Sequence, residues 1–241
     1  MISFEAGVFL VDKPLGPSSF RVVQHIRRAL GIKKVGHTGT LDPLASGLLI
    51  ICAGRPATRI IQQLMDGDKE YEATLQLGVE TETQDTEGKI IATKPVTDLD
   101  QSKVDRCLSE FLGEQLQIPP AFSALKHKGK PLYHYARKGI KIEKEARKIQ
   151  INEIECLAIG ESEISIRVRC GKGTYIRTLA ADIGNYLGYG AHLKTLRRTK
   201  NGPFSVERAI CGDKLKNKDE GKALLLQNFM TVEDTLALCK T

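Results

Sequence analysis

The chain has 241 residues, and its 36 lysines and arginines outnumber its 29 aspartates and glutamates, which gives a formal charge of +7. This length allows one large domain or two small ones with a substantial core, and the positive charge favours a polyanionic partner. No apolar run approaches the roughly 20 residues that span a bilayer, so we expect no transmembrane helix and no membrane partner.

The cysteines and the first residues indicate the compartment. None of the six cysteines has C-x-x-C spacing or a histidine at metal-ligand distance, so we expect reduced core thiols and no metal site. The N-terminal segment carries neither a basic stretch nor a long apolar stretch of the kind that directs export. We therefore expect a cytoplasmic protein.

The first 65 residues predict strands and helices on both sides of a glycine-rich loop. Residues 7–11 predict a short apolar strand, and Ser18 and Ser19 can cap a helix that ends at Gly31. After the loop, residues 48–52 predict a buried strand and residues 56–65 a second helix. The residues that share the predicted buried face of the first helix are Phe20, Val23, Ile26 and Leu30.

The loop at residues 36–47 carries the strongest signal of a site. It contains three glycines, which permit backbone angles that other residues avoid, together with the reactive side chains of His37 and Asp42. Rigidly held loop residues often serve a site. Two structural readings stay open, because Asp42 and Pro43 can start a helix and His37 can be a hydrogen-bonded structural histidine.

The middle of the chain predicts a strand, a helix and a long connection. From Tyr71 to Leu77 apolar and polar residues alternate, which predicts a half-buried strand with Tyr71 on its apolar face. A strand at residues 89–93 and a helix at 102–112 follow. Residues 116–148 predict a long loop that contains one short helix at about 131–138.

The last third predicts a mixture of strands and helices. The elements expected there are strands at 149–158, 163–170 and 203–206, helices at 174–187 and near 191–198, a charged break at 214–222 and one helix from Thr231. Because the order lacks a regular βαβ rhythm, we expect an α+β fold whose central sheet is largely antiparallel or mixed and is flanked by helices.

Positive charge is concentrated in one segment. Residues 126–148 hold nine lysines and arginines against two glutamates, with tyrosines and histidines interleaved, whereas residues 66–114 are rich in acids. This segregation predicts a basic face that binds phosphates. The residues of a second basic cluster are Lys194, Arg197, Arg198 and Lys200.

Nucleotide and metal motifs are missing, and two further residues stand out. The chain has no phosphate-binding-loop spacing, no G-x-G-x-x-G and no H-E-x-x-H. Arg177 falls in the first turn of a helix, where the macrodipole disfavours a cation, so either an acidic partner or a solvated surface position would explain it. Tyr71 fits either simple core packing or a site that uses its hydroxyl.

Five ordered motifs resemble the tRNA pseudouridine synthase B (TruB) family, bacterial type. The resemblance covers roughly residues 7–205. The motifs are VDKPLGPSS from residue 11, KVGHTGTLDPLASGLL from residue 34, KEY from residue 69, PPAFSALK from residue 119 and GTYIRTL from residue 173.

The resemblance implies the pseudouridine synthase fold and an isomerase that converts uridine 55 in the T loop of tRNA to pseudouridine. The uracil would detach, turn and rejoin the ribose through C5, with no cofactor. Asp42 matches the catalytic aspartate, acting either as a nucleophile or as an acid/base. Arg177 matches the arginine that would keep Asp42 ionised, and Tyr71 the tyrosine that stacks on the base.

The resemblance also implies residues that bind the RNA. The target uridine must leave its stack, and His37 matches the histidine that fills the vacated space. Lys13 and Pro14 match a segment that supports the site, and Leu196 matches a leucine that lines the uracil pocket. The basic insertion at about 120–148 matches an RNA-gripping segment that orders on tRNA; its substrate-binding lysines are Lys126, Lys128 and Lys130.

The resemblance predicts the domains and the partners. Residues 1–205 would form the catalytic domain, and residues 206–241 a short tail in which the usual PUA-like RNA-binding module is reduced or absent. We expect a monomer that binds the T arm of tRNA without a guide RNA or an obligate protein partner. Two other classes remain open, an RNA-binding factor without chemistry and a carboxylate glycosidase, although the latter would normally need two flanking acids.

Overall fold

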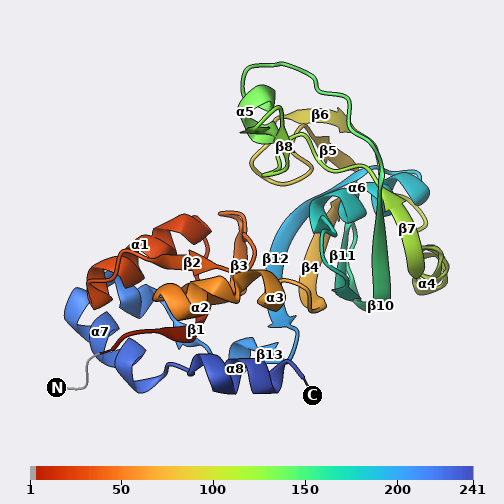
Figure 1. The fold of residues 1–241 in the computed structure, drawn as a ribbon. Coiled ribbons are helices and arrows are strands. Elements are labelled where there is room, and N and C mark those ends of the chain that lie inside the picture. The colour runs from red at the N-terminus through yellow and green to blue at the C-terminus, as the bar shows by residue number, and fades with distance from the viewer. Residues whose placement is uncertain (1–3, 241) are drawn as a thin grey trace. The chain divides into compact units, whose positions relative to one another are not determined.

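The computed structural model describes residues 4–240 of the chain (Figure 1). The chain forms two compact units, which are described separately below. The first unit comprises residues 1–71 and 196–241, and the second comprises residues 72–195. Two strands have residues in both units, namely β4 (Lys69–Leu77) and β12 (Ala191–Asn201).

The sheet of the first unit is mixed. Strand β1 (Gly7–Lys13) runs antiparallel to β3 (Ala45–Ala53), and β2 (Val35–His37) is also antiparallel to β3. The end of β12 runs parallel to the start of β3, with Leu196 opposite Ala45. Two short strands complete this part of the sheet, β13 (Phe204–Ser205) beside β12 and β14 (Ile210–Cys211) parallel to β1.

Strand β3 is the centre of the first unit's core. Every residue from Leu48 to Ala53 is 0% exposed, as expected for an uninterrupted apolar run that is covered on both faces. The neighbouring strand β1 contributes Val8, Phe9 and Val11, which are also fully buried. The core is thus built by segments that the sequence predicts as apolar strands.

Helix α1 (Ser19–Leu30) shows the predicted ends. The Ser18 side chain accepts a hydrogen bond from the Arg21 N–H, and Gly31 has a left-handed φ of 70°. The expected buried face is wrong at one position, because Phe20 is 54% exposed. The second expected helix is broken at Ile60 into α2 (Arg55–Arg59) and α3 (Ile61–Leu64).

The C-terminal segment packs with the N-terminal elements of the same unit. Helix α7 (Lys218–Gln227) contacts α1, and α8 (Val232–Leu238) contacts β1 (Figure 1). The predicted charged break at 214–222 is therefore wrong, because the Asn217 side chain caps α7 and two acids follow in its first turn. Two 3-10 helices precede α7, η1 (Val206–Arg208) and η2 (Gly212–Lys216).

The sheet of the second unit contains two antiparallel strand pairs around β10. Strand β10 (Arg147–Ile159) pairs with β11 (Glu163–Cys170) and with β7 (Gly113–Gln117). Ile164, Ile166 and Val168 of β11 are 0% exposed, which confirms the predicted alternation. Helices α4 (Gln101–Glu110) and α6 (Ile176–Tyr186) contact each other, and α4 also contacts β10.

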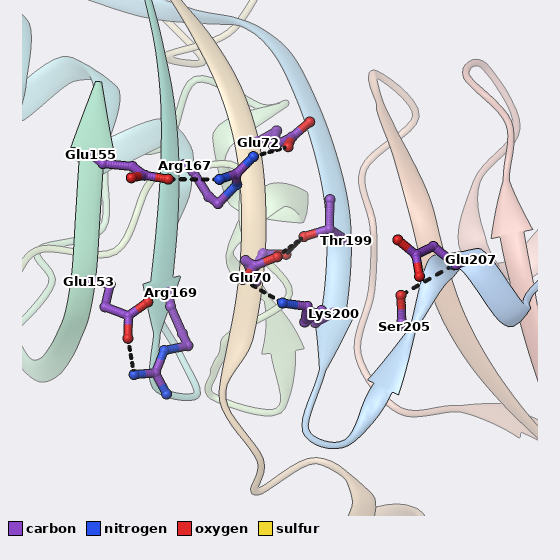
Figure 2. A network of polar contacts seen from close by, with 10 residues as sticks. All are labelled: Glu70, Glu72, Glu153, Glu155, Arg167, Arg169, Thr199, Lys200, Ser205 and Glu207. Atoms are coloured by element: carbon purple, nitrogen blue, oxygen red, sulfur yellow. Dashed lines mark hydrogen bonds and ion pairs between the residues drawn. The ribbon is translucent and has the colours of Figure 1, made fainter. Parts of the chain in front are cut away.

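The other face of this sheet carries exposed ion pairs (Figure 2). Arg167 on β11 bonds to Glu155 on β10 at 2.7 Å and to Glu72 on β4 at 3.0 Å. Arg169 pairs with Glu153 one step along the same strands. These pairs fix the strand register more than they add stability, since water screens them.

The remaining elements of the second unit are short. A hairpin joins β5 (Val79–Thr81) to β6 (Ile90–Thr93), and a second hairpin joins β8 (Lys126–His127) to β9 (Lys130–Pro131). Helix α5 (Leu132–Ala136) lies inside the predicted 131–138 helix. The second hairpin corrects the expected loop.

The helix expected near 191–198 is wrong, because this segment is strand β12. Leu193 and Leu196 are buried at a spacing of three, which imitates one face of a helix. Pairing with β3 overrides that local pattern, because Leu196, Arg197 and Arg198 lie opposite three consecutive β3 residues. The α+β class and the mixed sheet are confirmed.

Candidate active site

The glycine-rich segment forms a short loop at residues 38–44 between β2 and β3 of the first unit. Its backbone is held at several points. The Ser19 hydroxyl donates to the Leu41 carbonyl and accepts from the Leu41 N–H, both at 2.8 Å. The Gly16 N–H donates to the Pro43 carbonyl at 2.9 Å. The loop is therefore fixed by α1 and by the turn that precedes it.

Asp42 is half-buried on this loop and does not start a helix. The Ala45 N–H donates to the Asp42 carbonyl at 3.1 Å, and strand β3 begins at Ala45. The reading of Asp42 and Pro43 as a helix start is wrong, because the chain turns directly into a strand. The Asp42 carboxylate is thus carried by a loop whose backbone is fixed, as is common for residues that serve a site.

Lys13 provides a buried cation near the loop. It is 0% exposed, and its ammonium donates to the carbonyls of Pro14 at 2.9 Å and Pro17 at 2.8 Å. Burial lowers the pKa of Lys13 to about 8, while the charge of Asp42 raises it and that of Arg198 lowers it further. The electrostatic effect of Asp42 on Lys13 places the two charges in one neighbourhood.

His37 ends strand β2 just before the loop. Burial is the main cause that lowers its pKa, the nearby charge of Arg198 adds to the shift, and a hydrogen bond with the Gly39 backbone opposes it. The imidazole is therefore neutral at pH 7. Its Nδ1 is buried without a hydrogen-bond partner in the described part of the chain, which disagrees with a fully bonded structural histidine.

Two further predicted residues belong to the first unit. Leu196 is 9% exposed and lies opposite Ala45, three residues after Asp42, in the parallel register of β12 and β3. Tyr71 lies on β4 and is half-buried, whereas Leu75 and Leu77 on the same face are at most 1% exposed. The two leucines are core residues, whereas Tyr71 keeps part of its surface exposed, so core packing alone does not account for Tyr71.

Arg177 lies in the first turn of α6 in the second unit and is 6% exposed. Its guanidinium donates to an Asp85 carboxylate oxygen at 3.2 Å, to the Thr83 carbonyl at 3.2 Å and to the Phe122 carbonyl at 2.8 Å. The reading of Arg177 as a solvated surface residue is wrong. The carboxylate of Asp85 offsets the unfavourable position of a cation at a helix N-terminus.

Asp85 is a residue that the sequence analysis missed. It is 2% exposed, and its carboxylate accepts from the Thr83 hydroxyl, from the Glu87 N–H at 3.0 Å and from Arg177. The Thr81 hydroxyl also donates to its backbone carbonyl at 2.6 Å. The sequence places Asp85 among several acids and threonines in a turn, where nothing distinguishes it from a residue that only shapes the turn.

The start of α6 is fixed by a second set of contacts. Tyr175 offers no side-chain cap, and Gln117 at the end of β7 takes its place. The Gln117 amide accepts from the Tyr175 N–H at 2.8 Å and donates to the Tyr175 carbonyl at 3.1 Å. The Arg177 backbone is thus held by β7, in addition to the contacts of its side chain.

The basic insertion forms the β8–β9 hairpin and α5. Lys126, Lys128 and Lys130 are exposed on the hairpin, and no acid lies between Glu114 and Glu143. The Tyr135 hydroxyl donates to the His127 carbonyl at 3.1 Å, which ties the helix to the hairpin. This arrangement suits the backbone of a nucleic acid, because the lysines have no competing carboxylates nearby in sequence.

Residues 4–240 contain neither a cluster of metal-ligating side chains nor a helix that could span a membrane. These residues contain no group of three or more metal-ligating side chains that could hold an ion. None of their helices is long and apolar enough to cross a membrane. The cysteines are all free, but only Cys52, Cys107 and Cys170 are buried, whereas Cys211 and Cys239 are exposed, which corrects the expectation of core residues throughout.

The fold matches solved structures of Cbf5 chains. The chain resembles the crystal structure of a Cbf5-Nop10-Gar1 complex with a TM-score of 0.74 and 33% identity, over 96% of this chain and 62% of that chain. The archaeal box H/ACA sRNP Nop10-Cbf5 complex gives a TM-score of 0.67 at 31% identity, over 93% of this chain and 59% of the other. The chain thus spans less than two thirds of these Cbf5 chains.

Sequence comparison gives the family. The model of the TruB family pseudouridylate synthase N-terminal domain matches residues 27–176, and that of the tRNA pseudouridylate synthase B C-terminal domain matches residues 177–236. tRNA pseudouridine synthase B of Desulfotalea psychrophila is 61% identical over 86% of each chain, and that of Bordetella avium 50% over 91% of each. The chain belongs to the TruB family of pseudouridylate synthases and is an isomerase.

Proposed function

We propose that this enzyme isomerises uridine 55 in the T loop of tRNA to pseudouridine. The uracil leaves C1′ of the ribose, turns, and reattaches through C5, so the product has the same atoms as the substrate. The observation that carries this proposal is a half-buried aspartate, Asp42, on a loop that is hydrogen-bonded at several points, in a chain of this family. No cofactor is needed to balance the reaction.

Asp42 is proposed to act at the sugar. A carboxylate can attack C1′ and form a covalent intermediate, or it can move a proton near the ribose, and both roles need the ionised form at a fixed position. The fixed position is supported by the contacts of Ser19 and Gly16 with the loop. The buried ammonium of Lys13 favours the ionised form of a neighbouring acid.

Arg177 and Tyr71 are proposed to complete the catalytic set. Arg177 keeps Asp42 ionised once water has left the site, and Asp85 aims the Arg177 guanidinium by accepting one of its hydrogen bonds. A half-buried tyrosine offers a flat ring for a uracil to stack on. The fixed carbonyl contacts of Arg177 leave its side chain little freedom, which suits electrostatic stabilisation.

The substrate-binding residues are proposed to offset the free-energy cost of flipping the uracil out of its stack. Flipping a stacked nucleotide costs a few kcal/mol. His37, at the start of the loop that carries Asp42, can fill the vacated space. Lys13 and Pro14 support the adjoining turn, and Leu196 offers an apolar wall for the uracil.

The RNA partner is proposed to be the T arm of tRNA. The exposed lysines of the hairpin, Lys126, Lys128 and Lys130, would bind phosphates of the arm. The curated relatives carry the name tRNA pseudouridine synthase B, which supports tRNA as the substrate. We propose that the enzyme acts as a cytoplasmic monomer without guide RNA, with residues 1–205 as the catalytic domain and a short tail in place of a full PUA-like module.

The test is a map of pseudouridine in a tRNA transcript after incubation with the protein. The wild-type protein should modify uridine 55 alone, and Asp42→Asn should reduce the rate by more than about a thousandfold while the Kd for tRNA stays within about twofold. Asp213→Asn is the matched control, because Asp213 is an exposed aspartate paired with Lys216. Product at another uridine would reject the assigned position, and residual turnover of Asp42→Asn within about tenfold of wild type would reject the role of Asp42.

A further inference from the structure

Arg198 on β12 is a buried cation that the proposed chemistry does not use. It is 2% exposed and is the bulkiest of the fully buried side chains among the described residues. Burial of a guanidinium costs several kcal/mol unless its charge and its donors find partners. Its neighbour Arg197 is half-exposed and bonds to both carboxylate oxygens of Asp12, at 3.0 and 2.8 Å. A buried position for Arg198 therefore requires a reason of its own.

The hydrogen bonds of Arg198 go to the two ends of the Asp42 segment. Its Nε donates to the Leu48 carbonyl at 2.7 Å, in strand β3, and its Nη2 donates to the Gly39 carbonyl at 3.3 Å, in the loop. Gly39 lies three residues before Asp42 and Leu48 lies six residues after it. One rigid, planar group thus joins the beginning of the loop to the strand that follows it.

The backbone brings Arg198 unusually close to this segment. Arg198 lies opposite Gly47 in the parallel pairing of β12 with β3, and Gly47 has a left-handed φ of 100°. A Cβ at Gly47 would lie 2.2 Å from the Arg198 carbonyl oxygen, so only glycine fits there. Gly47 is thus the position that admits the arginine backbone beside the Asp42 segment.

The charge of Arg198 reaches both side chains that flank the loop. It lowers the pKa of His37, in addition to the effect of burial, and it lowers that of Lys13 while Asp42 raises it. Within residues 4–240, the hydrogen bonds of the Arg198 guanidinium go to carbonyl oxygens. Its positive charge therefore acts on the residues around Asp42 without a bonded carboxylate to cancel it.

We propose that Arg198 is a positioning residue of this enzyme, which clamps the Asp42 loop through the Gly39 and Leu48 carbonyls and holds a positive charge near it. The clamp holds the loop whether or not Asp42 is catalytic. Its effect on turnover rests on the proposed role of Asp42. Arg198 contacts no reacting atom. It holds the loop that carries the carboxylate, and its charge adds to the lowering of the His37 and Lys13 pKa values that burial mainly causes.

The experiment compares Arg198→Met and Arg198→Lys with the wild-type protein. The three measurements are hydrogen exchange of the loop amides at 38–44, NMR titration of the His37 imidazole, and the split between kcat and KM on a tRNA transcript. Arg208→Met is the matched control, because Arg208 is exposed in η1 of the same unit.

Arg198→Met removes both the donors and the charge. We expect loop exchange to rise by at least about tenfold, the His37 pKa to rise while staying below its ordinary value because burial persists, and kcat to fall by about a hundredfold with KM within about threefold. Arg198→Lys keeps the charge but not the fork of donors. Its loop exchange should rise, its His37 pKa should stay low, and its kcat should lie between those of wild type and Arg198→Met.

Unchanged loop exchange and an unchanged His37 titration in both variants would overturn the clamp. Faster exchange with an unaltered kcat would overturn its role in the reaction. If Arg198→Met does not fold, Arg198→Lys decides, since a folded lysine variant with wild-type exchange and kcat refutes the proposal. A wild-type protein that makes no pseudouridine, while both variants loosen the loop, would reject the proposed function and leave the clamp standing.

Discussion

Two buried arginines, one in each unit, are held by different kinds of partner. Arg177 in the second unit bonds to the Asp85 carboxylate as well as to two carbonyls, whereas Arg198 in the first unit bonds to carbonyls alone. A carboxylate partner both neutralises the charge of the buried guanidinium and fixes its position. Carbonyl partners fix the position of the guanidinium but do not neutralise its charge, which still acts on neighbouring groups. Arg177 is thus a guanidinium that an ion pair orients, whereas Arg198 is a guanidinium whose charge acts on the residues around it.

Loss of Arg177 should have the largest effect. Arg177→Met leaves Asp85 as a buried carboxylate without its ion-pair partner, so we expect unfolding free energy to fall by about 3 kcal/mol and kcat to fall by about a thousandfold. Chemical denaturation and single-turnover pseudouridine formation measure the two effects. Arg167→Met, which removes an exposed arginine of the same unit, is the control. Stability within about 0.5 kcal/mol of wild type would show that Asp85 does not need the arginine.

Asp85→Asn should sharpen the comparison, because it keeps the shape and removes the charge. The asparagine can still accept from Arg177, so we expect a destabilisation of about 1–2 kcal/mol and a loss of kcat of about tenfold to a hundredfold, with KM little changed. Double-mutant cycles with Arg177→Met should give a coupling energy of at least about 1 kcal/mol. Additive effects of the two changes would mean that the ion pair has no energetic role.

Lys13 should make the activity of the enzyme depend on pH through a buried group of the first unit. The pKa of Lys13 is lowered to about 8, chiefly by burial, so the ammonium that bonds to Pro14 and Pro17 is lost as pH rises through about 8. We expect the turnover rate to decline on the alkaline limb of the pH–rate profile, as the pH rises through about 8. Lys13→Arg should move the limb to higher pH, because a guanidinium stays protonated. An unshifted limb in Lys13→Arg would assign it to another group.

The lowered pKa of Lys13 also makes the free energy of unfolding depend on pH. Below pH 8 the native protein holds a buried charged lysine, and between about 8 and 10.5 the unfolded chain binds more protons at this residue than the native one. The contribution of Lys13 therefore makes the native state more stable as pH rises across that window. Denaturation of the wild type and of Lys13→Met on both sides of the window measures it.

The smallest effects should come from the exposed hairpin of the second unit. Neutralising Lys126, Lys128 and Lys130 together should weaken tRNA binding and reduce the slope of log K against log salt by about 2. The chemical step in single turnover at saturating enzyme should stay within about threefold. Neutralising Lys214, Lys218 and Lys222 in the tail is the matched control for the loss of three exposed lysines. An unchanged salt slope would remove the hairpin from the RNA interface.

The sequence by itself determined the elements whose local pattern matches their final environment. Strand β3 is an unbroken apolar run, β11 alternates strictly, and α1 has a serine cap and a terminal glycine, so each was predicted from its own residues. The ordered motifs also determined the family and singled out Asp42, Tyr71 and Arg177 as candidates. Their roles are proposals that the variants described above test.

Only the tertiary structure decided the features that depend on a distant partner. Residues 191–198 resemble a helix until β3 pairs with them, and Asn217 starts a helix where charge suggested a break. Asp85 and Arg198 resemble surface charges, and they are buried because Arg177 lies 92 residues from one and Leu48 lies 150 residues from the other. A chain's own pattern reports its preference for burial, but the partner that satisfies a buried charge is chosen when separated segments meet.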